Sequence, residues 1–319
     1  MNYPKVSIII LNWNGLKDTI ECLESLKQLT YPNYEVIVVD NGSTDDSVKF
    51  IKELTSSRVN GLNNSLINNK STIRLIENRT NLGYAEGNNI AIRQVLREGE
   101  SDFILLLNND TVVEKNFLSE LVKVAQSEKE IGILGPKIYY HDYQGRKNVI
   151  QSAGSMVNLC AGRFPSVERL DEVDNKDIKE PRSVDFVIGA CLLVKTEVVK
   201  KIGLLDKRFF CLFEDTDWCL RAKKVGFKIL YVPSSIIWHK KSQSVKKISE
   251  VYYYTRNLFW LESKHANIFQ LLCFLLHYFI FIFPQYFFGY MIIKRDYDLL
   301  KNYTRGVVDG ILGKRVMLI

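Results

Sequence analysis

Short runs of apolar residues alternate along the first half of the chain with segments in which apolar residues recur every three or four positions. The runs have the length and β-branched content of buried strands, whereas the periodic segments have the pattern of helices with one apolar face. We expect strands at residues 6–11, 35–40, 72–76 and 103–107, helices at residues 17–29, 48–54, 85–97 and 116–125, and a polar surface loop at residues 55–71. This alternation predicts an α/β fold with a mostly parallel, doubly wound, Rossmann-like sheet.

Two of the predicted strands end in side chains that offer oxygen atoms. Three leucines lead directly into Asn108, Asn109 and Asp110, and another apolar run ends in Asp40. Ligands of doubly wound sheets bind at the carboxyl ends of the strands. The chain has no G-x-G-x-x-G after its first strand and no G-x-x-x-x-G-K-[ST], which disfavours dinucleotide oxidoreductases and P-loop kinases. A diphosphate bound without a glycine-rich loop needs a cation, and Asp110 supplies part of such a site.

The segment FEDTDW brings three carboxylates together within four residues, namely Glu214, Asp215 and Asp217. Basic residues follow in the last turn of the same predicted helix, a distribution that complementarity to the helix dipole alone would produce. Crowding of like charges also raises the pKa of a carboxylate and makes it a better general base. A structural and a catalytic interpretation of this block are therefore both open.

The charge of the chain is unevenly distributed. Residues 240–319 hold 12 lysines and arginines against five acidic residues, whereas the first 239 residues carry equal numbers of each. An enzyme that acts on nucleic acid is expected to carry its basic excess around the site, so nucleic acid is not an expected partner. The six cysteines form no C-x-x-C pair, which disfavours a zinc knuckle and a disulfide framework.

The same C-terminal part contains an uncharged, apolar run at residues 266–293, long enough to enter a bilayer and broken by Pro284. A single crossing would carry the basic residues that follow it to the outer side, against the positive-inside tendency. We therefore expect a hairpin or an in-plane pair of helices, peripheral or monotopic, on the cytoplasmic face of a membrane. The alternative is a hydrophobic helix packed on the main domain or on another subunit.

Seven sequence blocks follow one another in an order found in one known family. The blocks are VSIIILNWNG, VVDNGSTDDS, NLGYAEGNN, LLLNNDT, GPKIYY, VDFVIGACLLVK and FEDTDWCLRAKKVGF. The set resembles the family-2 glycosyltransferases with a GT-A fold, and within them the rhamnosyltransferase-like branch. It implies a GT-A catalytic domain at residues 1–245, with a nucleotide-binding half at about 1–112 and an acceptor half at about 113–245. A helical, membrane-associating segment is expected at residues 246–319.

The resemblance implies roles for the residues that match the family. The residues implied to bind the donor are Asn12, Asn14, Asp40, Asn81, Gly83, Asn108 and Asn109, with Asn88 and Asn89 as further candidates. Asp40 matches the aspartate that accepts a hydrogen bond from a uracil or thymine ring, although it is equally suited to start an Asx-turn. The family usually has D-x-D where this chain has Asn-Asn-Asp. Asp110 is then the retained ligand of Mn²⁺ or Mg²⁺, and His239 is the second metal ligand.

The resemblance also implies the reaction. Asp215 matches the general base, which deprotonates an acceptor hydroxyl for a single displacement that inverts the anomeric carbon. The expected donor is dTDP-rhamnose or a UDP-sugar, and the expected acceptor is a glycan or a lipid-linked glycan. Candidates for the acceptor side are Gly189, Ala190, Glu214, Asp217 and Trp218. The alternatives are a catalytically inactive scaffold that binds a nucleotide-sugar, and a sugar nucleotidylyltransferase, which needs an N-terminal phosphate loop that this chain lacks.

Overall fold

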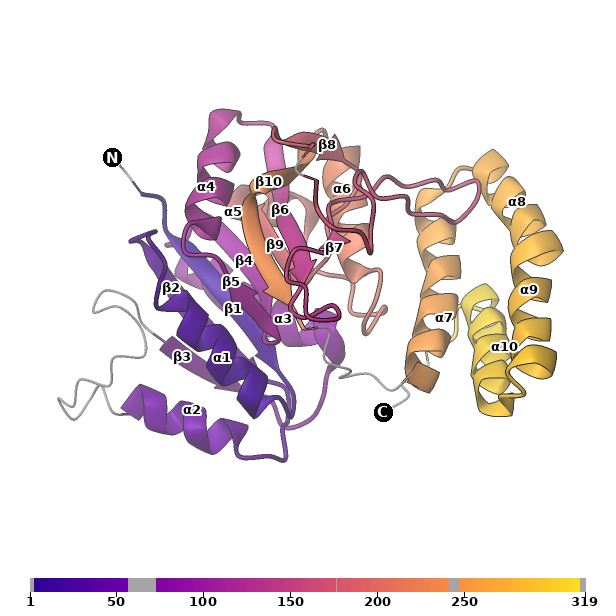
Figure 1. Cartoon of the computed structure of the whole chain (residues 1–319), viewed down its shortest axis with the longest axis horizontal. Coiled ribbons are helices and arrows are strands. Elements are labelled where there is room, and N and C mark those ends of the chain that lie inside the picture. The colour runs from indigo at the N-terminus through magenta and orange to yellow at the C-terminus, as the bar shows by residue number, and fades with distance from the viewer. Residues whose placement is uncertain (1–2, 57–72, 176, 241–246, 316–319) are drawn as a thin grey trace.

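The structure is a computed structural model that describes residues 3–56, 73–175, 177–240 and 247–315. The expected loop at residues 55–71 lies almost wholly outside the described residues. A sheet with helices on both faces forms one side of the molecule, and helices from the C-terminal part of the chain stand beside it (Figure 1). The predicted α/β architecture is confirmed.

Within the described residues, ten strands form one mixed sheet. Its order is β3-β2-β1-β4-β9-β6-β10-β5, with β7 beside β6 and β8 beside β10. The strands are β1 (Val6–Asn12), β2 (Tyr34–Asp40), β3 (Ile73–Glu77), β4 (Phe103–Asn108), β5 (Thr111–Val113), β6 (Ile131–Tyr140), β7 (Ile150–Ser152), β8 (Arg182–Val184), β9 (Cys191–Lys195) and β10 (Lys228–His239). Strands β1 to β4 are parallel to their neighbours in this group, and β9 runs antiparallel between β4 and β6. The four strands predicted from the apolar runs correspond to β1 to β4.

Helices cover both faces of the sheet because the strand residues alternate between two cores. The helices of this part are α1 (Leu16–Leu26), α2 (Ser47–Ser56), α3 (Gly83–Glu98), α4 (Phe117–Ser127), α5 (Thr196–Ile202) and α6 (Glu214–Lys224). In β1, Ile8 and Ile10 belong to the core under α1 and α4, whereas Ile9 belongs to the core under α3, α5 and α6. Successive side chains of a strand point to opposite faces, so each run of consecutive apolar residues serves both cores.

The register of the parallel strands brings predicted site residues to one edge of the sheet. Asn12 pairs with Asp40 across β1 and β2, and Leu11 pairs with Asn108 across β1 and β4. Strand β10 does not end at Val232 but continues to His239. Its register on β6 shifts between Val232 and Ile236. This irregularity lets the strand continue past the Pro-Ser-Ser interruption and ends it at His239.

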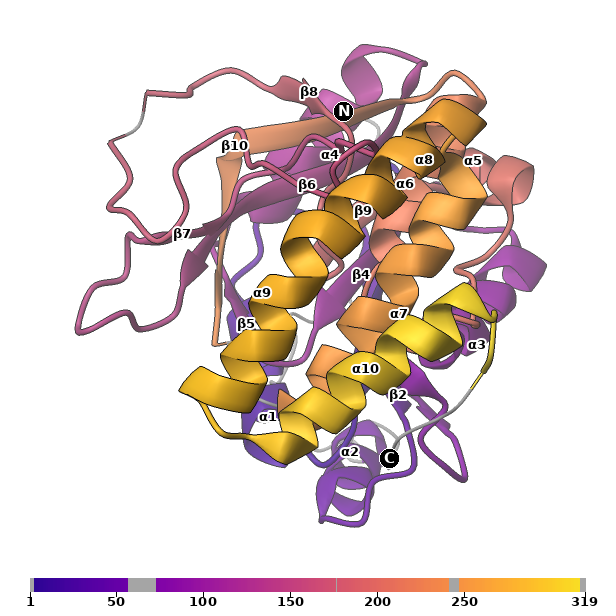
Figure 2. The ribbon, with the colours of Figure 1, turned by 90° about the vertical axis from the view of Figure 1, so that its right-hand side faces the viewer.

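The C-terminal helices are α7 (Lys247–His265), α8 (Ile268–His277), α9 (Phe283–Phe288) and α10 (Tyr297–Ile311). Wide π-helical turns at Tyr278–Ile282 and Gly289–Ile293 make α8 and α9 parts of one continuous helix over Ile268–Ile293. The expected break at Pro284 is therefore wrong. A proline lacks an N–H and its ring crowds the carbonyl one turn earlier, and a π-helical turn directly before it accommodates both defects. The α8–α9 helix is a single rod that lies alongside α7 and α10 (Figure 2).

These helices share an aromatic core with the α/β part of the chain. The rings of Phe259 on α7 and Tyr278 are 4.7 Å apart, and Phe209 and Phe213 from the loop before α6 belong to the same cluster. Helix α10 packs closely on α7, because a Cβ on Gly306 would lie 2.9 Å from the carbonyl oxygen of Tyr252. The outer face of the long helix is exposed and apolar, with Ile268, Phe269, Leu272, Leu276, Ile280, Phe281, Phe288, Ile292 and Ile293.

Candidate active site

The carboxyl ends of β1 and β2 are joined by side-chain hydrogen bonds. Asn12 Nδ2 donates to Asp40 Oδ2 at 2.8 Å, and Asp40 Oδ1 accepts from the backbone N–H groups of Gly42 (3.1 Å) and Ser43 (2.9 Å). The hydrogen bonds from Gly42 and Ser43 form the Asx-turn that was one of the two interpretations of Asp40 from the sequence. An ionised carboxylate accepts about four hydrogen bonds. The three that Asp40 makes within the fold leave acceptor capacity beside Asn12.

Asparagines organise the loops that follow these strands. The exposed Asn14 has a left-handed φ of 52°, and its Oδ1 accepts from the backbone N–H of Thr44 at 2.7 Å. Asn81 Oδ1 accepts from Asn41 Nδ2 at 2.9 Å and from the backbone N–H of Gly83 at 2.9 Å. The expected donor-binding loops are thus connected to the end of β2.

Asn41, which follows Asp40, is a residue that the sequence reasoning missed. Its side chain is buried, and its Oδ1 accepts from Asn78 Nδ2 at 3.1 Å. A polar residue directly after the strand-ending Asp40 was the signal that could have found it. Asn88 and Asn89 are also buried and bond to backbone carbonyls of Tyr84 and Leu205, so their amides serve the fold.

The Asn-Asn-Asp segment lies next to β1. Asn109 Nδ2 donates to Asn12 Oδ1 at 3.2 Å and to Thr19 Oγ1 at 3.1 Å, which ties the segment to the start of α1. The side chain of Asn108 is half-buried, and its backbone N–H donates to the carbonyl of Ala190 at 3.0 Å. The predicted donor residues Asn12, Asp40 and Asn109 therefore form one connected group.

Asp110 and His239 meet at the same edge of the sheet, with Asp110 Oδ1 3.1 Å from His239 Nε2. The other ring nitrogen, Nδ1, is 2.6 Å from Oε1 of Gln151. An amide oxygen only accepts, so Nδ1 donates to Gln151 and Nε2 is the ring nitrogen that faces Asp110. A contact of this length between a carboxylate oxygen and a ring nitrogen has either a proton or a cation between the two atoms. Adjacent ligands of a cation with bonds of about 2.1 Å lie about 3 Å apart, so the pair fits a divalent cation.

Gln151 was not predicted as a site residue. It lies on β7, and no local sequence pattern marks it. Among the described residues, no group of three or more His, Cys, Asp and Glu side chains is arranged to hold a metal ion. Asp110 and His239 alone would leave most of the coordination positions of a divalent cation to other ligands.

A short backbone bridge connects the Asn-Asn-Asp segment to Asp215. Ala190 accepts the hydrogen bond from Asn108, and the neighbouring Gly189 donates its N–H to Asp215 Oδ2 at 2.7 Å. On the other side of the bridge, Tyr84 donates its hydroxyl to the carbonyl of Gly189 at 2.6 Å. A Cβ on Gly189 would lie 2.8 Å from the Tyr84 hydroxyl, so the glycine permits this close approach. The bridge brings the predicted base to the predicted donor side.

The first two acids of the FEDTDW block have raised pKa values. Burial raises the pKa of Asp215, although hydrogen bonds from Gly189 and Thr216 oppose the shift. Burial, followed by the charge of Asp215, raises the pKa of Glu214 well above its usual range. These shifts favour a protonated Glu214 beside an Asp215 that still accepts hydrogen bonds. In such a pair, Asp215 can accept a proton while Glu214 is the neutral acid.

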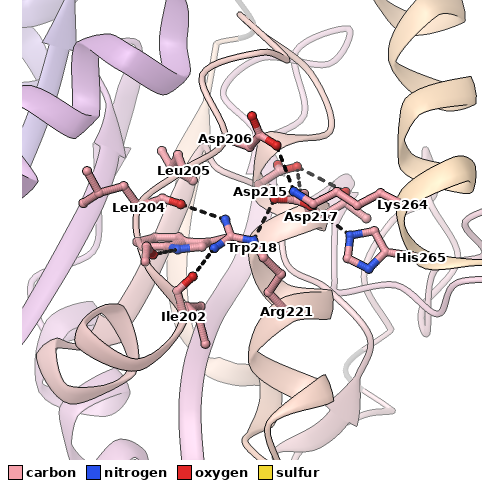
Figure 3. Close-up of polar contacts among 12 residues, drawn as sticks. Ile202, Leu204, Leu205, Asp206, Asp215, Asp217, Trp218, Arg221, Lys264 and His265 are labelled. Carbon is pink, nitrogen blue, oxygen red and sulfur yellow. Dashed lines mark hydrogen bonds and ion pairs between the residues drawn. The ribbon is translucent and has the colours of Figure 1, made fainter. Parts of the chain in front are cut away.

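The other two candidates of this block, Asp217 and Trp218, have no exposed surface. Asp217 accepts from Arg221 Nε at 2.9 Å, from Lys264 Nζ at 2.6 Å and from His265 Nε2 at 2.8 Å (Figure 3). Burial alone would raise the pKa of Asp217, but the bond from His265 and the neighbouring cations outweigh it and lower that pKa. Trp218 Nε1 donates to the carbonyl of Gly203 at 2.8 Å. Both side chains are used within the fold, and Asp217 connects α6 to the end of α7.

The comparison with known families decides the identity. The profile of the family described as "Glycosyltransferase like family 2" matches residues 4–250. The chain belongs to the family-2 glycosyltransferases. The family predicted from the seven sequence blocks is thus confirmed, and the relatives of this glycosyltransferase include rhamnosyltransferases, as the resemblance implied.

Two curated relatives illustrate the similarity. This glycosyltransferase is 30% identical over 253 residues to the uncharacterized protein y4gI of Sinorhizobium fredii, in an alignment that covers 76% of the chain and 25% of y4gI. It is 28% identical over 245 residues to the N-acetylglucosaminyl-diphospho-decaprenol L-rhamnosyltransferase of Mycobacterium tuberculosis, which covers 70% of the chain and 71% of the relative. The chain thus spans only about a quarter of the length of y4gI.

A solved structure supports the fold. The mannosyltransferase PcManGT from Pyrobaculum calidifontis, in complex with GDP-Man and Mn²⁺, superposes with a TM-score of 0.59. The two sequences are 13% identical, and the superposition covers 98% of this chain and 89% of that one. The likeness confirms the predicted GT-A fold for the glycosyltransferase.

Proposed function

We propose that this glycosyltransferase moves a sugar from a nucleoside diphosphate donor, dTDP-rhamnose or a UDP-sugar, to a hydroxyl group of a glycan or lipid-linked glycan acceptor. The observation that carries the proposal is the bridge through Ala190 and Gly189, because it joins Asn108 at a strand end to Asp215 by two backbone hydrogen bonds. Nucleotide-facing residues and a carboxylate of raised pKa therefore share one edge of the sheet.

The donor is held at the ends of β1 and β2. Asp40 offers its remaining acceptor capacity to the imide of a uracil or thymine ring, while Asn14, Asn81 and Gly83 shape the flanking loops. Asn12 and Asn109 support this arrangement through the hydrogen bonds between them. The half-buried Asn108 is available to a hydroxyl group of the ribose or of the sugar.

Asp215 acts as the general base of a single displacement. Its carboxylate takes the proton of the acceptor hydroxyl while that oxygen attacks the anomeric carbon, and the bond from this carbon to the diphosphate oxygen breaks. The electron pair of the broken bond leaves with the nucleoside diphosphate, so the configuration is inverted. The N–H of Gly189 fixes the orientation of the base, and the raised pKa of Asp215 makes it a stronger proton acceptor than an exposed aspartate. Glu214 lies next to the base and lines the acceptor side.

Asp110 and His239 are the residues that would hold the divalent cation. A divalent cation held there would stabilise the negative charge that develops on the departing diphosphate. His239 favours Mn²⁺ over Mg²⁺, because imidazole is a softer ligand than Mg²⁺ prefers. The Mn²⁺ in the complex of PcManGT supports the assignment of this cofactor class.

The exposed, apolar outer face of the helix over Ile268–Ile293 supports a position on a membrane surface. Phe274 and Tyr278 on its inner face are buried against the neighbouring helices, so an in-plane position keeps this packing whereas a crossing would break it. Lys294 and Arg295 follow the helix directly and suit anionic headgroups at the cytoplasmic face. The decaprenol-linked acceptor in the name of the M. tuberculosis relative supports a lipid-linked acceptor here as well.

Calorimetric titration with UDP and dTDP, with and without Mn²⁺, tests the proposal. We expect one nucleotide to bind in a Mn²⁺-dependent manner, and the corresponding nucleotide-sugar to be hydrolysed slowly without an acceptor. Binding without any turnover in the presence of cell-envelope glycan acceptors would favour the inactive scaffold. Release of pyrophosphate from a nucleoside triphosphate and a sugar phosphate would instead identify a nucleotidylyltransferase. Failure of both nucleotides to bind would contradict the proposal.

A further inference from the structure

The loop directly before the catalytic helix has an unusual backbone. Phe210, Leu212 and Phe213 have φ angles of 64°, 68° and 73°, in the left-handed region that residues other than glycine seldom adopt. Phe213 is the N-cap of α6, and its carbonyl accepts the N–H of Asp217 at 2.8 Å. The conformation of this loop therefore sets where α6 begins and where Asp215, two residues later, points. Such a backbone persists only where its surroundings hold it.

Asn257 on α7 is the main polar support of this loop. Its Nδ2 donates to the carbonyls of Cys211 at 2.7 Å, Leu212 at 2.8 Å and Phe209 at 3.0 Å. The two N–H bonds of one amide are thus shared among three converging carbonyl oxygens. Asn257 has no exposed surface, so water cannot replace these hydrogen bonds without rearrangement of the loop.

Arg256 orients the amide of Asn257. Its Nε and Nη2 donate to Asn257 Oδ1 at 3.0 and 2.8 Å, which turns Nδ2 toward the loop. Nη2 also donates to the carbonyl of Phe209 at 3.0 Å. The buried guanidinium lies 4.3 Å from the ring centre of Trp260 and 4.9 Å from that of Tyr253, so aromatic faces offset part of its desolvation. The pair is a built support and not a chance contact of a surface helix.

The other side of the loop rests on the donor-binding half. The carbonyl of Phe210 accepts the N–H of Ala85 at 3.2 Å, and a Cβ on Gly83 would lie 2.5 Å from the Phe210 ring. The Phe210 ring stacks on Tyr253 of α7, with 5.1 Å between the ring centres. The loop is therefore clamped between the start of α3 and helix α7.

We propose that Asn257, oriented by Arg256, is a positioning residue for Asp215. It holds the left-handed loop that fixes the first turn of α6, and so it acts on the base without touching the substrates. Both residues lie outside the span of 4–250 that matches the family profile. They also lie on a helix for which the sequence suggested only a role in membrane association. The inference rests on the proposed function, because it takes Asp215 as the base.

The test compares Asn257→Ala with the wild-type chain. We expect kcat for hydrolysis of UDP-glucose or dTDP-rhamnose, whichever the wild type accepts, to fall by about 10²-fold, because a base displaced by about 1 Å loses that much. The KM for the nucleotide-sugar and the affinity for UDP or dTDP with Mn²⁺ should stay within about twofold, since none of the three carbonyl groups that Asn257 contacts belongs to a predicted donor-binding residue. Asn257→Ser keeps one donor and should give an intermediate kcat. Asn302→Ala on α10, which removes an amide bonded to one carbonyl of its own helix, is the matched control.

Four results would overturn the inference. An unchanged kcat in Asn257→Ala means that the loop does not need this support. Parallel losses of nucleotide affinity and kcat, or failure of both Asn257 variants to fold, would assign Asn257 a purely structural role. If the wild type binds neither UDP nor dTDP, both the proposed function and this inference are contradicted. If the wild type and Asn257→Ala are equally active, only the inference is contradicted.

Discussion

Nε2 of His239 lies 3.1 Å from Oδ1 of Asp110, although 129 positions separate the two residues in the sequence. They meet because β10 is antiparallel to β5, which starts directly after Asp110, and His239 pairs with Thr111. The contact therefore depends on the last strand of the sheet being in register with a three-residue strand.

Removing either member of this pair should weaken the binding of the cation. We expect Asp110→Asn and His239→Ala to lower the Mn²⁺-dependent part of UDP or dTDP affinity, with Asp110→Asn the more severe because it removes a charge. Gln151→Ala should cost about 10- to 100-fold in Mn²⁺ affinity, because Gln151 holds the tautomer of His239. Calorimetric titration of UDP or dTDP in Mn²⁺ and in EDTA measures the Mn²⁺-dependent part of the affinity for each variant. Gln94→Ala on the outside of α3 is the control, and equal losses in both media would contradict a role in metal binding.

Replacing the base should separate chemistry from binding. Asp215→Asn is expected to lower kcat by about 10²- to 10⁴-fold with nucleotide affinity retained. Burial raises the pKa of the Glu214 carboxyl well above its usual range, and Glu214→Gln puts a neutral amide of the same shape in its place, so the loss of kcat should be much smaller. Release of the nucleoside diphosphate measures turnover, and the exposed Asp177→Asn is the control. A larger loss in Glu214→Gln than in Asp215→Asn would assign the base to Glu214.

The pH dependence of turnover should reflect the raised pKa of Asp215. The base must be deprotonated, so kcat falls as the pH drops through this pKa, at a higher pH than for an exposed aspartate. Thr216 Oγ1 donates to Asp215 Oδ1 at 3.2 Å and stabilises the charged form. Thr216→Val removes this donor while keeping the side-chain shape, so the acid limb should move to still higher pH. A limb that stays in place would show that the titrating group is not Asp215.

Glu262 on α7 should make the stability of the fold pH-dependent. Its side chain has no exposed surface, its carboxylate oxygens have no hydrogen-bond partner among the described residues, and burial raises its pKa from 4.5 to about 8. The folded state then keeps a proton that the unfolded state loses, so stability falls as the pH rises from 4.5 to 8. The full shift corresponds to an upper bound of roughly 5 kcal/mol.

Glu262→Gln replaces the titratable carboxyl group with a neutral amide and should abolish this loss of stability at higher pH. We expect the Tm of the variant to exceed that of the wild type more at pH 8 than at pH 5. The exposed Glu250→Gln on the same helix should leave the two Tm values at wild-type levels. A wild-type Tm that does not fall between pH 5 and pH 8 relative to Glu262→Gln would mean that Glu262 is solvated or paired.

Membrane attachment should depend on the outer face of the long helix. Serine in place of Phe269, Leu272, Leu276 and Ile280 should shift the protein from vesicles containing anionic lipid to the supernatant, because each buried CH₂ contributes about 0.8 kcal/mol. Sedimentation with phosphatidylglycerol-containing and neutral vesicles measures this. Leu170→Ser, at an exposed apolar position in another part of the chain, is the control. A variant that stays on the vesicles, or a wild type that dimerises without binding them, would point to a protein partner for this face.

The sequence was most informative where a local pattern fixes the structure. The runs in β1 to β4 serve two cores and so are apolar throughout, which identified the strands and the edge that carries Asp40 and Asp110. The end of β10 was not predictable, because the Pro-Ser-Ser interruption hides a strand whose continuation depends on pairing with β6. Pro284 misled for a similar reason, since a π-helical turn is decided by the surroundings of a helix and not by its composition.

The contacts between distant segments were the least predictable part of the site. Gln151 and Asn257 carry no motif, and each acquires its role only because the fold brings it to His239 or to the loop before α6. Asp217 and Trp218 look like acceptor-binding residues in the sequence because they adjoin Asp215. Their side chains nevertheless point into the protein, since a helix turns successive residues through about 100°.

Gly306, which lets α10 approach α7, links the C-terminal helix to the positioning of the catalytic base. A methyl group on Gly306 would collide with the backbone of Tyr252 and with Thr255, one residue before the arginine that orients Asn257. A substitution at a residue that contacts no sugar, nucleotide or lipid can therefore lower activity by separating α7 from α10. When a substitution in α10 abolishes activity, loss of the packing between α7 and α10 is the first explanation to test.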